Sequence, residues 1–355
     1  MHGKGSTMAK LKFMEGHALD PKLVLCPHCG EEERIGVHDR SEQLYKCHDC
    51  GSTFSANKGT VFAGLHYPVW VVVLVLTLLA YGCPPAAIVV AFRIDERTLR
   101  DWQAKAGEQG KRVQAQIVCN GRVELGQVQA DELRVKTQQG TAWIATAMSV
   151  FPRLFVWAEV SPHRNKQLVR RLMDKVAQAA RSTVAPILVA VDGFAAYPKA
   201  LRAALHTKLH TGKQGRPKHI PWPHVHIVQV VKSRQGRQLK QVQRRLVQGA
   251  WHMVYALIAM SQVGAGTINT AYIERLNATL RARMPTLVRR TRSLARSLQR
   301  LETEIFWTGV VYNFCTVHTS LDATPAMAAD LTDHVWSVEE LLRLGSPLKS
   351  LQGVL

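Results

Sequence analysis

The sequence predicts a mixed α/β protein, and two observations lead to this prediction. First, three runs rich in β-branched and aromatic residues, 123–133, 141–150 and 154–160, follow one another with turn residues between them. They predict an antiparallel meander of three strands. Second, a segment with apolar residues at helical spacing, 166–181, is followed by a continuous apolar run at 186–191 that predicts a buried strand.

The same alternation continues toward the C-terminus. Residues 197–205 predict a helix and 224–231 a strand, and the remainder to about residue 318 is expected to be mainly helix. The resulting order of elements, βββαβαβα, is that of a ribonuclease-H-like α/β domain. We therefore expect such a domain over residues 122–325, followed by a C-terminal tail over 326–355.

Two CxxC pairs near the N-terminus predict a zinc ribbon over residues 23–57, after an N-terminal tail over 1–22. A glycine follows each pair, and four thiolates around one ion leave no open position for chemistry, so one structural Zn²⁺ is expected. The zinc would supply folding energy on the order of 10 kcal/mol. The alternative is four unpaired thiols, and His28 and His48 are expected to be exposed spectators. The predicted ligands are Cys26, Cys29, Cys47 and Cys50.

Between these two regions, residues 65–116 predict a helix-turn-helix DNA-binding domain. Its helices are expected over 69–81, over 86–92 and after Asp95, which is a suitable N-cap. On the third helix Leu99, Trp102 and Ala106 form an apolar face. The expected outward-facing residues are Glu96, Arg97, Arg100 and Gln103. The alternative is a small helical bundle with a solvated charged face.

The charge of the chain indicates a polyanionic partner. Lys and Arg number 46 against 26 Asp and Glu, which gives a formal net charge of +20. Eight arginines and no acid lie between residues 275 and 301. We expect double-stranded DNA as the partner and a cytoplasmic, nucleoid-associated bacterial protein. The apolar run at 69–80 is interrupted by Cys83-Pro84-Pro85 before it could span a membrane, so no membrane partner is expected.

Three acidic residues lie at positions that suit catalysis in an α/β domain. Asp131 lies in the first predicted strand, Asp192 at the carboxyl end of the apolar strand, and Glu274 on a later helix. Carboxylates that lie close together repel unless a cation joins them, and their oxygens favour Mg²⁺ or Mn²⁺. Two such ions would catalyse phosphoryl transfer. Glu132 is an alternative first ligand, since only one of two neighbouring strand residues faces a given side.

Two segments give the chain a family resemblance. Residues 191–198 read VDGFAAYP and residues 272–281 read YIERLNATLR. With the ribbon and the helix-turn-helix before them, they resemble the DDE transposases of bacterial insertion sequences, most closely the IS-one-like group. The resemblance implies that Asp131, Asp192 and Glu274 form a catalytic, metal-binding triad with two ions. It also implies strand cleavage at the 3′ ends of terminal inverted repeats, followed by strand transfer into target DNA.

Several residues are expected to contact DNA, and the assembly on DNA is expected to be at least a homodimer because two ends must be bound. Two alternatives stay open: a catalytically idle DNA-binding regulator, and a ribonuclease-H-like nuclease without strand transfer. A histidine metal site between residues 206 and 226 is a further alternative to a basic surface there. The predicted DNA contacts are Arg97, Arg100, Asn277, Arg281, Arg283, Arg289 and Arg290.

Overall fold

The computed structural model describes residues 20–40, 44–120, 123–180, 185–210, 216–236, 238–260, 267–288, 291 and 293–345. The chain divides into two compact units. We call residues 1–75 with 342–355 the ribbon unit, and residues 76–341 the sheet unit. This division differs from the predicted segments, since most of the expected helix-turn-helix lies in the same unit as the large sheet.

The ribbon unit is built on a small antiparallel sheet with the strand order β1-β2-β3. Tyr45 and Phe54 stack at 5.6 Å between ring centroids, and they share one small core with Val24, Cys26 and Cys47. So small a core does not supply enough free energy to fold the unit alone. The cysteine pairs predict that a bound metal ion supplies the rest. The elements are η1 (Pro21–Leu23), β1 (Ile35–Asp39), β2 (Leu44–Cys47) and β3 (Thr53–Ser55).

The sheet unit contains a six-stranded mixed sheet with the order β11-β10-β7-β4-β5-β6. The predicted meander is present, because β5 runs antiparallel to both β4 and β6. β4, β7 and β10 run parallel, and β11 closes the edge antiparallel to β10. The strands are β4 (Gln127–Thr137), β5 (Gly140–Ser149), β6 (Leu154–Ser161), β7 (Ile187–Asp192), β10 (Val225–Gln235) and β11 (Gln238–Gln248).

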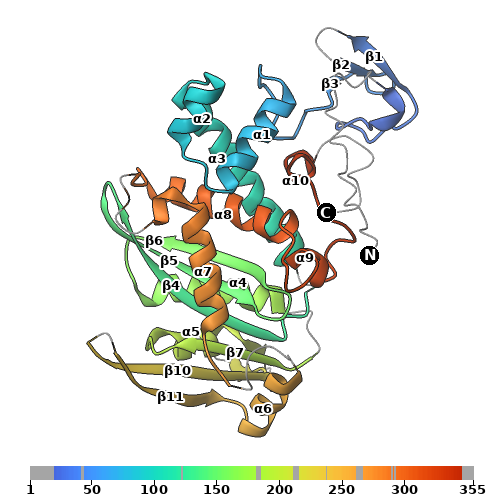
Figure 1. Ribbon diagram of the computed structural model, residues 1–355. Helices are drawn as coiled ribbons and strands as arrows, with labels where there is room; N and C mark the ends of the chain where they lie inside the picture. Colours follow the sequence, from blue (N-terminus) through green and yellow to red (C-terminus); the bar gives the residue numbers. More distant parts are fainter. Residues whose placement is uncertain are drawn as a thin grey trace, which may run out of the picture. The chain divides into compact units, whose positions relative to one another are not determined.

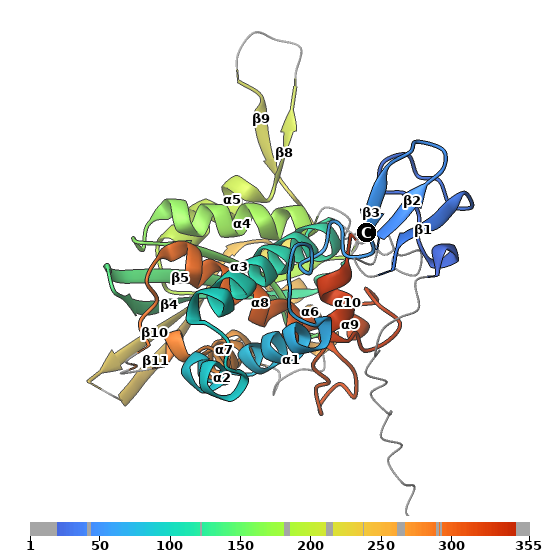
Figure 2. The same cartoon turned by 90° about the horizontal axis from the view of Figure 1, so that it is seen from above.

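Helices cover both faces of this sheet. The helices α4 and α5 lie on one face and α6 and α7 on the other, as Figure 2 shows most clearly, and α8 packs against the edge strand β6. Their apolar residues recur at helical spacing, for example Leu168, Leu172 and Val176 on α4, which are all buried. The helices are α4 (Lys166–Ala180), α5 (Ala196–Ala204), α6 (Trp251–Met260), α7 (Ala271–Arg283), α8 (Leu298–Phe314) and the shorter α9 (Pro325–Ala328) and α10 (Val338–Arg343).

The region after β10 was expected to be mainly helix, and this prediction is wrong for β11. In β11, Val242, Arg244 and Leu246 are half-buried, whereas Gln241, Gln243 and Arg245 are exposed. That alternation has a period of two, which is the period of a strand. In the sequence it is hard to recognise, because a charged residue, Arg244, stands at one of the inward-facing positions. A separate hairpin of β8 (His206–Leu209) and β9 (Lys218–Pro221) also precedes β10, and it was not expected.

The helices before the sheet agree closely with expectation: α1 (Val69–Ala80), α2 (Pro85–Phe92) and α3 (Glu96–Val113), which continues into a π-helical turn η2 (Gln114–Val118). Asp95 caps α3 as predicted, since its carboxylate accepts the N–H groups of Arg97 at 2.7 Å and Thr98 at 3.4 Å. Figure 1 shows α3 beside α8.

The contact between α3 and α8 explains why α3 belongs to the sheet unit. A Cβ placed at Gly107 of α3 would lie 2.4 Å from Cβ of Thr303 on α8, and one at Gly110 would lie 3.0 Å from the Phe306 carbonyl oxygen. Glycine is needed at both positions because the two backbones approach so closely. Over its length α3 is therefore built into the sheet unit rather than into a separate small domain.

Among the described residues no helix has the length and apolar character that a bilayer crossing requires. The most apolar one, α1, has 12 residues, which is roughly 18 Å of helix against a hydrocarbon core of about 30 Å.

Candidate functional site

The four predicted cysteines converge in the ribbon unit. Their sulfurs all lie within 4.8 Å of one another, with Sγ of Cys26 at 3.6 Å from Cys50 and Sγ of Cys29 at 3.6 Å from Cys47. Four sulfurs around a tetrahedral zinc lie roughly 3.8 Å apart when each Zn–S bond is about 2.3 Å. The donor set and its spacing therefore fit one structural zinc ion.

The local backbone explains how each cysteine pair forms a knuckle. Gly30 follows the first pair with φ of 79°, and its N–H donates to the Cys26 carbonyl at 2.9 Å. Gly51 follows the second pair with φ of 71°. Residues other than glycine rarely adopt these left-handed backbone angles, so each of the two turns requires its glycine. His28 and His48 are exposed, as expected, and neither belongs to the cysteine group.

The sheet unit brings two of the three predicted acids together. In the parallel ladder Ala130 of β4 pairs with Val191 of β7, so Asp131 and Asp192 are the next residues on neighbouring strands. Oxygens of Asp131, Asp192 and also Glu132 lie within 4.8 Å of one another. We call these three residues the acidic cluster. It lies at the carboxyl end of β7, where open α/β sheets bind ligands.

Asp131 and Glu132 belong to opposite faces of the sheet, as the alternation along β4 predicts. Asp131 Oδ2 accepts a hydrogen bond from Asn277 Nδ2 of α7 at 3.0 Å. Glu132 Oε2 instead accepts from Arg164, which precedes α4 on the other face. Both carboxylates nevertheless approach Asp192, because β7 ends there.

Glu274 lies outside the acidic cluster. It is in the first turn of α7, and its side chain is 52% exposed. Its Oε1 accepts a hydrogen bond from Thr270 Oγ1 at 2.9 Å and forms an ion pair with Lys232 of β10. The structure therefore places the third predicted acid on the helix that contacts Asp131, but with its carboxylate held by a lysine.

Gln129 positions α7 against β4, and the sequence reasoning missed it. This buried side chain lies two residues before Asp131, so it points to the same face of the sheet. Its Oε1 accepts the N–H groups of Tyr272 at 3.1 Å and Ile273 at 3.0 Å, and its Nε2 donates to the Asn269 carbonyl at 2.8 Å. The available signal was that Gln129 alternates with the apolar residues Val128 and Ala130 and shares its face of the strand with Asp131.

Two carboxyl groups of the acidic cluster have raised pKa values, and burial is the main cause in both. Burial raises the pKa of Asp131, and the charges of Asp192 and Glu274 add to the rise, whereas the hydrogen bond from Asn277 opposes it. Burial also raises the pKa of Glu132, against lowering by Tyr197 and Arg164. A divalent cation would reverse the repulsion, because it favours the charged form of each carboxylate.

The predicted DNA contacts fall into different environments. Arg97 is exposed on α3, and Arg100 is half-buried with its guanidinium 3.9 Å from Glu96. Arg281 is half-buried on α7. Arg289 and Arg290 lie outside the described residues.

Two predicted DNA contacts are used inside the protein instead. Arg283 is half-buried near the rings of Tyr81 and Tyr312, at 4.5 and 5.9 Å, and it donates to Thr316 Oγ1 at 3.1 Å. Burial lowers the pKa of Arg283. Asn277 is 1% exposed and hydrogen-bonds Asp131, so it belongs to the acidic site rather than to a DNA-facing surface. The sequence could not reveal either burial, because both depend on distant segments.

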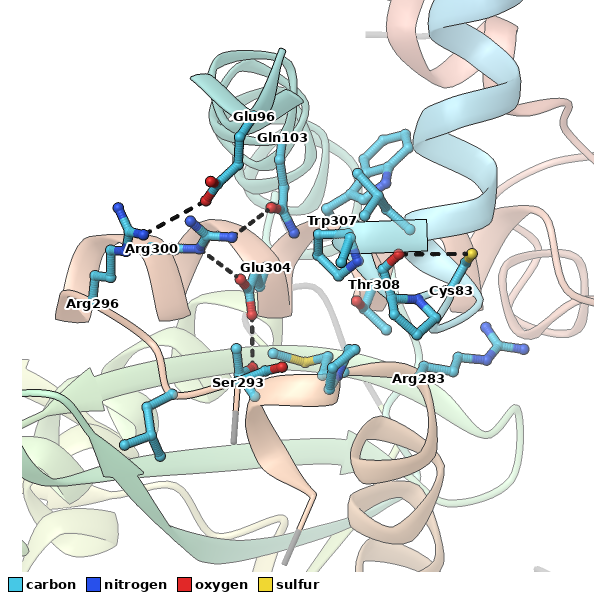
Figure 3. Close-up of a pocket in the computed structure, with 18 of the residues that line it drawn as sticks. Cys83, Glu96, Gln103, Arg283, Ser293, Arg296, Arg300, Glu304, Trp307 and Thr308 are labelled. Carbon is cyan, nitrogen blue, oxygen red and sulfur yellow. Dashed lines mark hydrogen bonds and ion pairs between the residues drawn. The ribbon is translucent and has the colours of Figure 1, made fainter. Parts of the chain in front are cut away.

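A cavity of about 510 Å³ lies between α2, α3, η3 (Pro285–Leu287) and α8, and no member of the acidic cluster lines it. Figure 3 shows Arg300 reaching Gln103 and Glu304, and Arg296 reaching Glu96. Gln103 was expected to face outward, but it accepts from Arg300 at 3.4 Å. Each arginine here already has a partner, so the polar groups of the cavity join α3 to α8.

Among the described residues, the histidines between β7 and α7 form no metal-binding group. In the part of the chain that the structure describes, only the four cysteines and the acidic cluster bring three or more candidate ligands together. His206 and His219 stack on each other at 4.0 Å across the β8–β9 hairpin.

A scan against protein-family models and a search of the curated proteins find no match for this chain. The fold and the sites define a mixed α/β protein with a four-cysteine cluster and an acidic cluster, each suited to a metal ion.

Proposed function

We propose that this chain is a DNA transposase of the DDE type, which binds the terminal inverted repeats of its own element, cleaves 3′ strand ends and joins them to target DNA. One observation carries the proposal. Asp131, in the middle of β4, lies beside Asp192, at the carboxyl end of the parallel strand β7, with oxygens within 4.8 Å. Carboxylates in that position serve metal-dependent phosphoryl transfer.

The sheet topology supports a ribonuclease-H-like catalytic domain. In such a domain the first strand is central and lies beside the fourth. Here β4 is the first strand of the sheet unit, and it lies between β5 and β7, which are the second and fourth strands in chain order of the six-stranded sheet. The edge strand β11 and the β8–β9 hairpin are additions to this arrangement.

The acidic residues fit the metal that this activity requires. Asp131, Asp192 and Glu274 would hold Mg²⁺ or Mn²⁺, since hard cations favour carboxylate oxygens. When bound, two such ions lower the pKa of the attacking oxygen and stabilise the leaving oxygen of a phosphodiester. Asn277 orients the Asp131 carboxylate through its 3.0 Å hydrogen bond. Glu274 would join after its carboxylate leaves Lys232.

The distribution of charge supports a nucleic-acid substrate. From residue 193 to residue 273 the sequence contains no Asp or Glu and twelve Lys or Arg. This stretch includes β10 and β11, which pair with each other as a two-stranded ribbon. The ribbon extends past the end of β7, where Val230 of β10 pairs with Asp192. A polyanion lying along this ribbon would meet only cationic or neutral side chains from the stretch.

The exposed start of α3 with Arg97 is proposed as the recognition element of a helix-turn-helix, and the zinc ribbon as a further contact to DNA or to a second subunit. Two element ends must be held together for strand transfer, so a dimer or larger assembly on DNA belongs to the proposal. One observation favours the alternative of a catalytically idle DNA-binding regulator: Glu274 is paired with Lys232 and lies outside the acidic cluster.

The decisive experiment incubates candidate end DNA with the protein and Mg²⁺ or Mn²⁺. Wild type is compared with Asp131→Asn, Asp192→Asn and Glu274→Gln, and with Asp174→Asn as the control, because Asp174 is paired with Arg170 on the surface of α4. We expect the three site variants to bind DNA but lose cleavage, while the control cleaves normally. Joined products would exclude a simple nuclease, and a wild type that binds without cleaving would favour the regulator.

A further inference from the structure

Arg164 bridges two members of the acidic cluster. Its Nε and Nη2 donate to Glu132 Oε2 at 3.1 and 2.6 Å, and Nη2 also lies 3.3 Å from Asp192 Oδ2. The guanidinium lies 4.1 Å from the centre of the Phe194 ring and 5.3 Å from that of Trp143. Two aromatic rings and two carboxylates therefore hold it in a defined orientation.

The buried position of Glu132 suits a residue that holds the Arg164 guanidinium in place. Its side chain is 0% exposed, and all the hydrogen bonds that it accepts from Arg164 fall on Oε2. Its other oxygen, Oε1, and the hydroxyl of Tyr197 are both buried, and the interaction of Glu132 with Tyr197 lowers the pKa of the Glu132 carboxyl group. Burial, followed by the charge of Glu132, raises the pKa of Tyr197 far above its ordinary value, so the two groups are neighbours.

Asp131 differs from Glu132 in its partners. It faces α7, where Asn277, a neutral amide, donates to Oδ2. No ion pair of Asp131 is present among the described residues, whereas Glu132 is already neutralised by Arg164. The cluster thus contains one carboxylate without a cationic partner among the described residues, Asp131, and two that share Arg164, Glu132 and Asp192.

We infer that Glu132 is not a metal ligand but the anchor of Arg164, and that Arg164 binds a phosphate of the nucleic-acid strand beside Asp192. The inference rests on the proposed function and specifies how its substrate is held. Arg164 Nη1 makes no hydrogen bond in the described part of the chain, and the side chain is 34% exposed, so its outer edge is open to a ligand. Arginine suits this role because its planar fork matches two phosphate oxygens.

The first test measures Mn²⁺ affinity of the protein without DNA, by calorimetry on zinc-loaded protein. If Asp192 is a ligand and Glu132 an anchor, Asp192→Asn should weaken Mn²⁺ binding by about tenfold or more, and Glu132→Gln by less than about threefold. Arg164→Gln should strengthen Mn²⁺ binding, since a cation that competes for Asp192 is removed. Loss of Mn²⁺ binding in Glu132→Gln as large as in Asp192→Asn would overturn the inference.

The second test measures DNA affinity in Ca²⁺, so that binding is separated from cleavage. Arg164→Gln should weaken binding of end DNA by about tenfold, and Arg164→Lys by less, because lysine keeps the charge but not the fork. Arg170→Gln is the matched control, since Arg170 lies on α4 in an ion pair with Asp174. Equal DNA affinity of Arg164→Gln and Arg170→Gln would contradict a phosphate contact.

The single variant Arg164→Gln leaves Glu132 buried without its cation and could unfold. The double variant Glu132→Gln with Arg164→Gln replaces the ion pair with two neutral amides, and it should fold while showing the same loss of DNA affinity. Failure of the proposed function is distinguishable: wild type would then not cut DNA, whereas the Mn²⁺ titrations would still decide whether Glu132 is a ligand.

Discussion

Asn277 of α7 donates a hydrogen bond to Asp131 of β4 at 3.0 Å, although the two residues lie 146 positions apart in the sequence. The Asn277 amide oxygen in turn accepts from Thr146 Oγ1 at 2.9 Å, so the amide is held between two strands of the sheet. This relationship fixes the helix that carries Glu274 to the strand that carries Asp131. It also explains why an asparagine expected to contact DNA is buried instead.

Replacing Gln129 with Leu should destabilise the sheet unit by about 1–3 kcal/mol. The change leaves the N–H groups of Tyr272 and Ile273 without the acceptor that they share, and unsatisfied buried groups carry their full desolvation cost. Urea unfolding followed by circular dichroism measures the difference. Gln241→Leu on the exposed part of β11 is the control, and equal stability of the two variants would show that Gln129 does not anchor α7.

Replacing Lys232 with Gln should strengthen Mn²⁺ binding by the sheet unit. Lys232 is the cation that holds Glu274 outside the acidic cluster, so its removal frees that carboxylate to join Asp131 and Asp192. Calorimetric titration measures the affinity, and Lys240→Gln on exposed β11 is the control because it removes the same charge farther along the ribbon. In the double variant with Glu274→Gln the gain should vanish; a gain that persists would mean that Glu274 is not recruited.

Removing zinc should unfold the ribbon unit. Its core is small, and binding of a structural zinc contributes on the order of 10 kcal/mol to the free energy of folding. Elemental analysis of wild type should find one zinc per chain. In Cys47→Ser the zinc should be lost, and hydrogen exchange over residues 20–75 should become rapid. Cys83→Ser is the matched control, since Cys83 lies outside the cysteine cluster. Full zinc content in Cys47→Ser would contradict the site.

Without divalent cations, the stability of the sheet unit should fall as pH rises from about 4 toward neutrality. Folding raises the pKa of Asp131 and Glu132, so the folded state holds their protons more tightly than the unfolded state. Their favourable contribution is complete below the unfolded pKa values and is lost as pH passes through the raised folded values. Thermal melts across this range measure the effect.

Mg²⁺ should reverse this trend, because it binds the charged carboxylates of the folded state. Asp131→Asn should show a weaker pH dependence than wild type in the absence of Mg²⁺. A melting profile of Asp131→Asn that follows wild type at every pH would show that this carboxyl does not contribute.

Much of the local structure could be predicted from the sequence. The cysteine knuckles, the Asp95 cap and the strand that ends at Asp192 all depend on residues close together in the chain, and they are present in the structure. The strand β11 was missed because Arg244 interrupts its apolar face, and the Arg244 guanidinium donates to the Ile268 carbonyl at 2.9 Å. Local pattern cannot anticipate such a partner.

The sequence by itself determined the local features: four cysteines at metal spacing, an acid at the end of the apolar strand, and an excess of positive charge. Only the tertiary structure decided which of them meet. It brought Glu132 and Arg164 to Asp192, held Glu274 on Lys232, and buried Asn277 and much of Arg283. The physical reason is that burial and pairing are set by contacts between distant segments, whereas turns, caps and periodicity are set by neighbours along the chain.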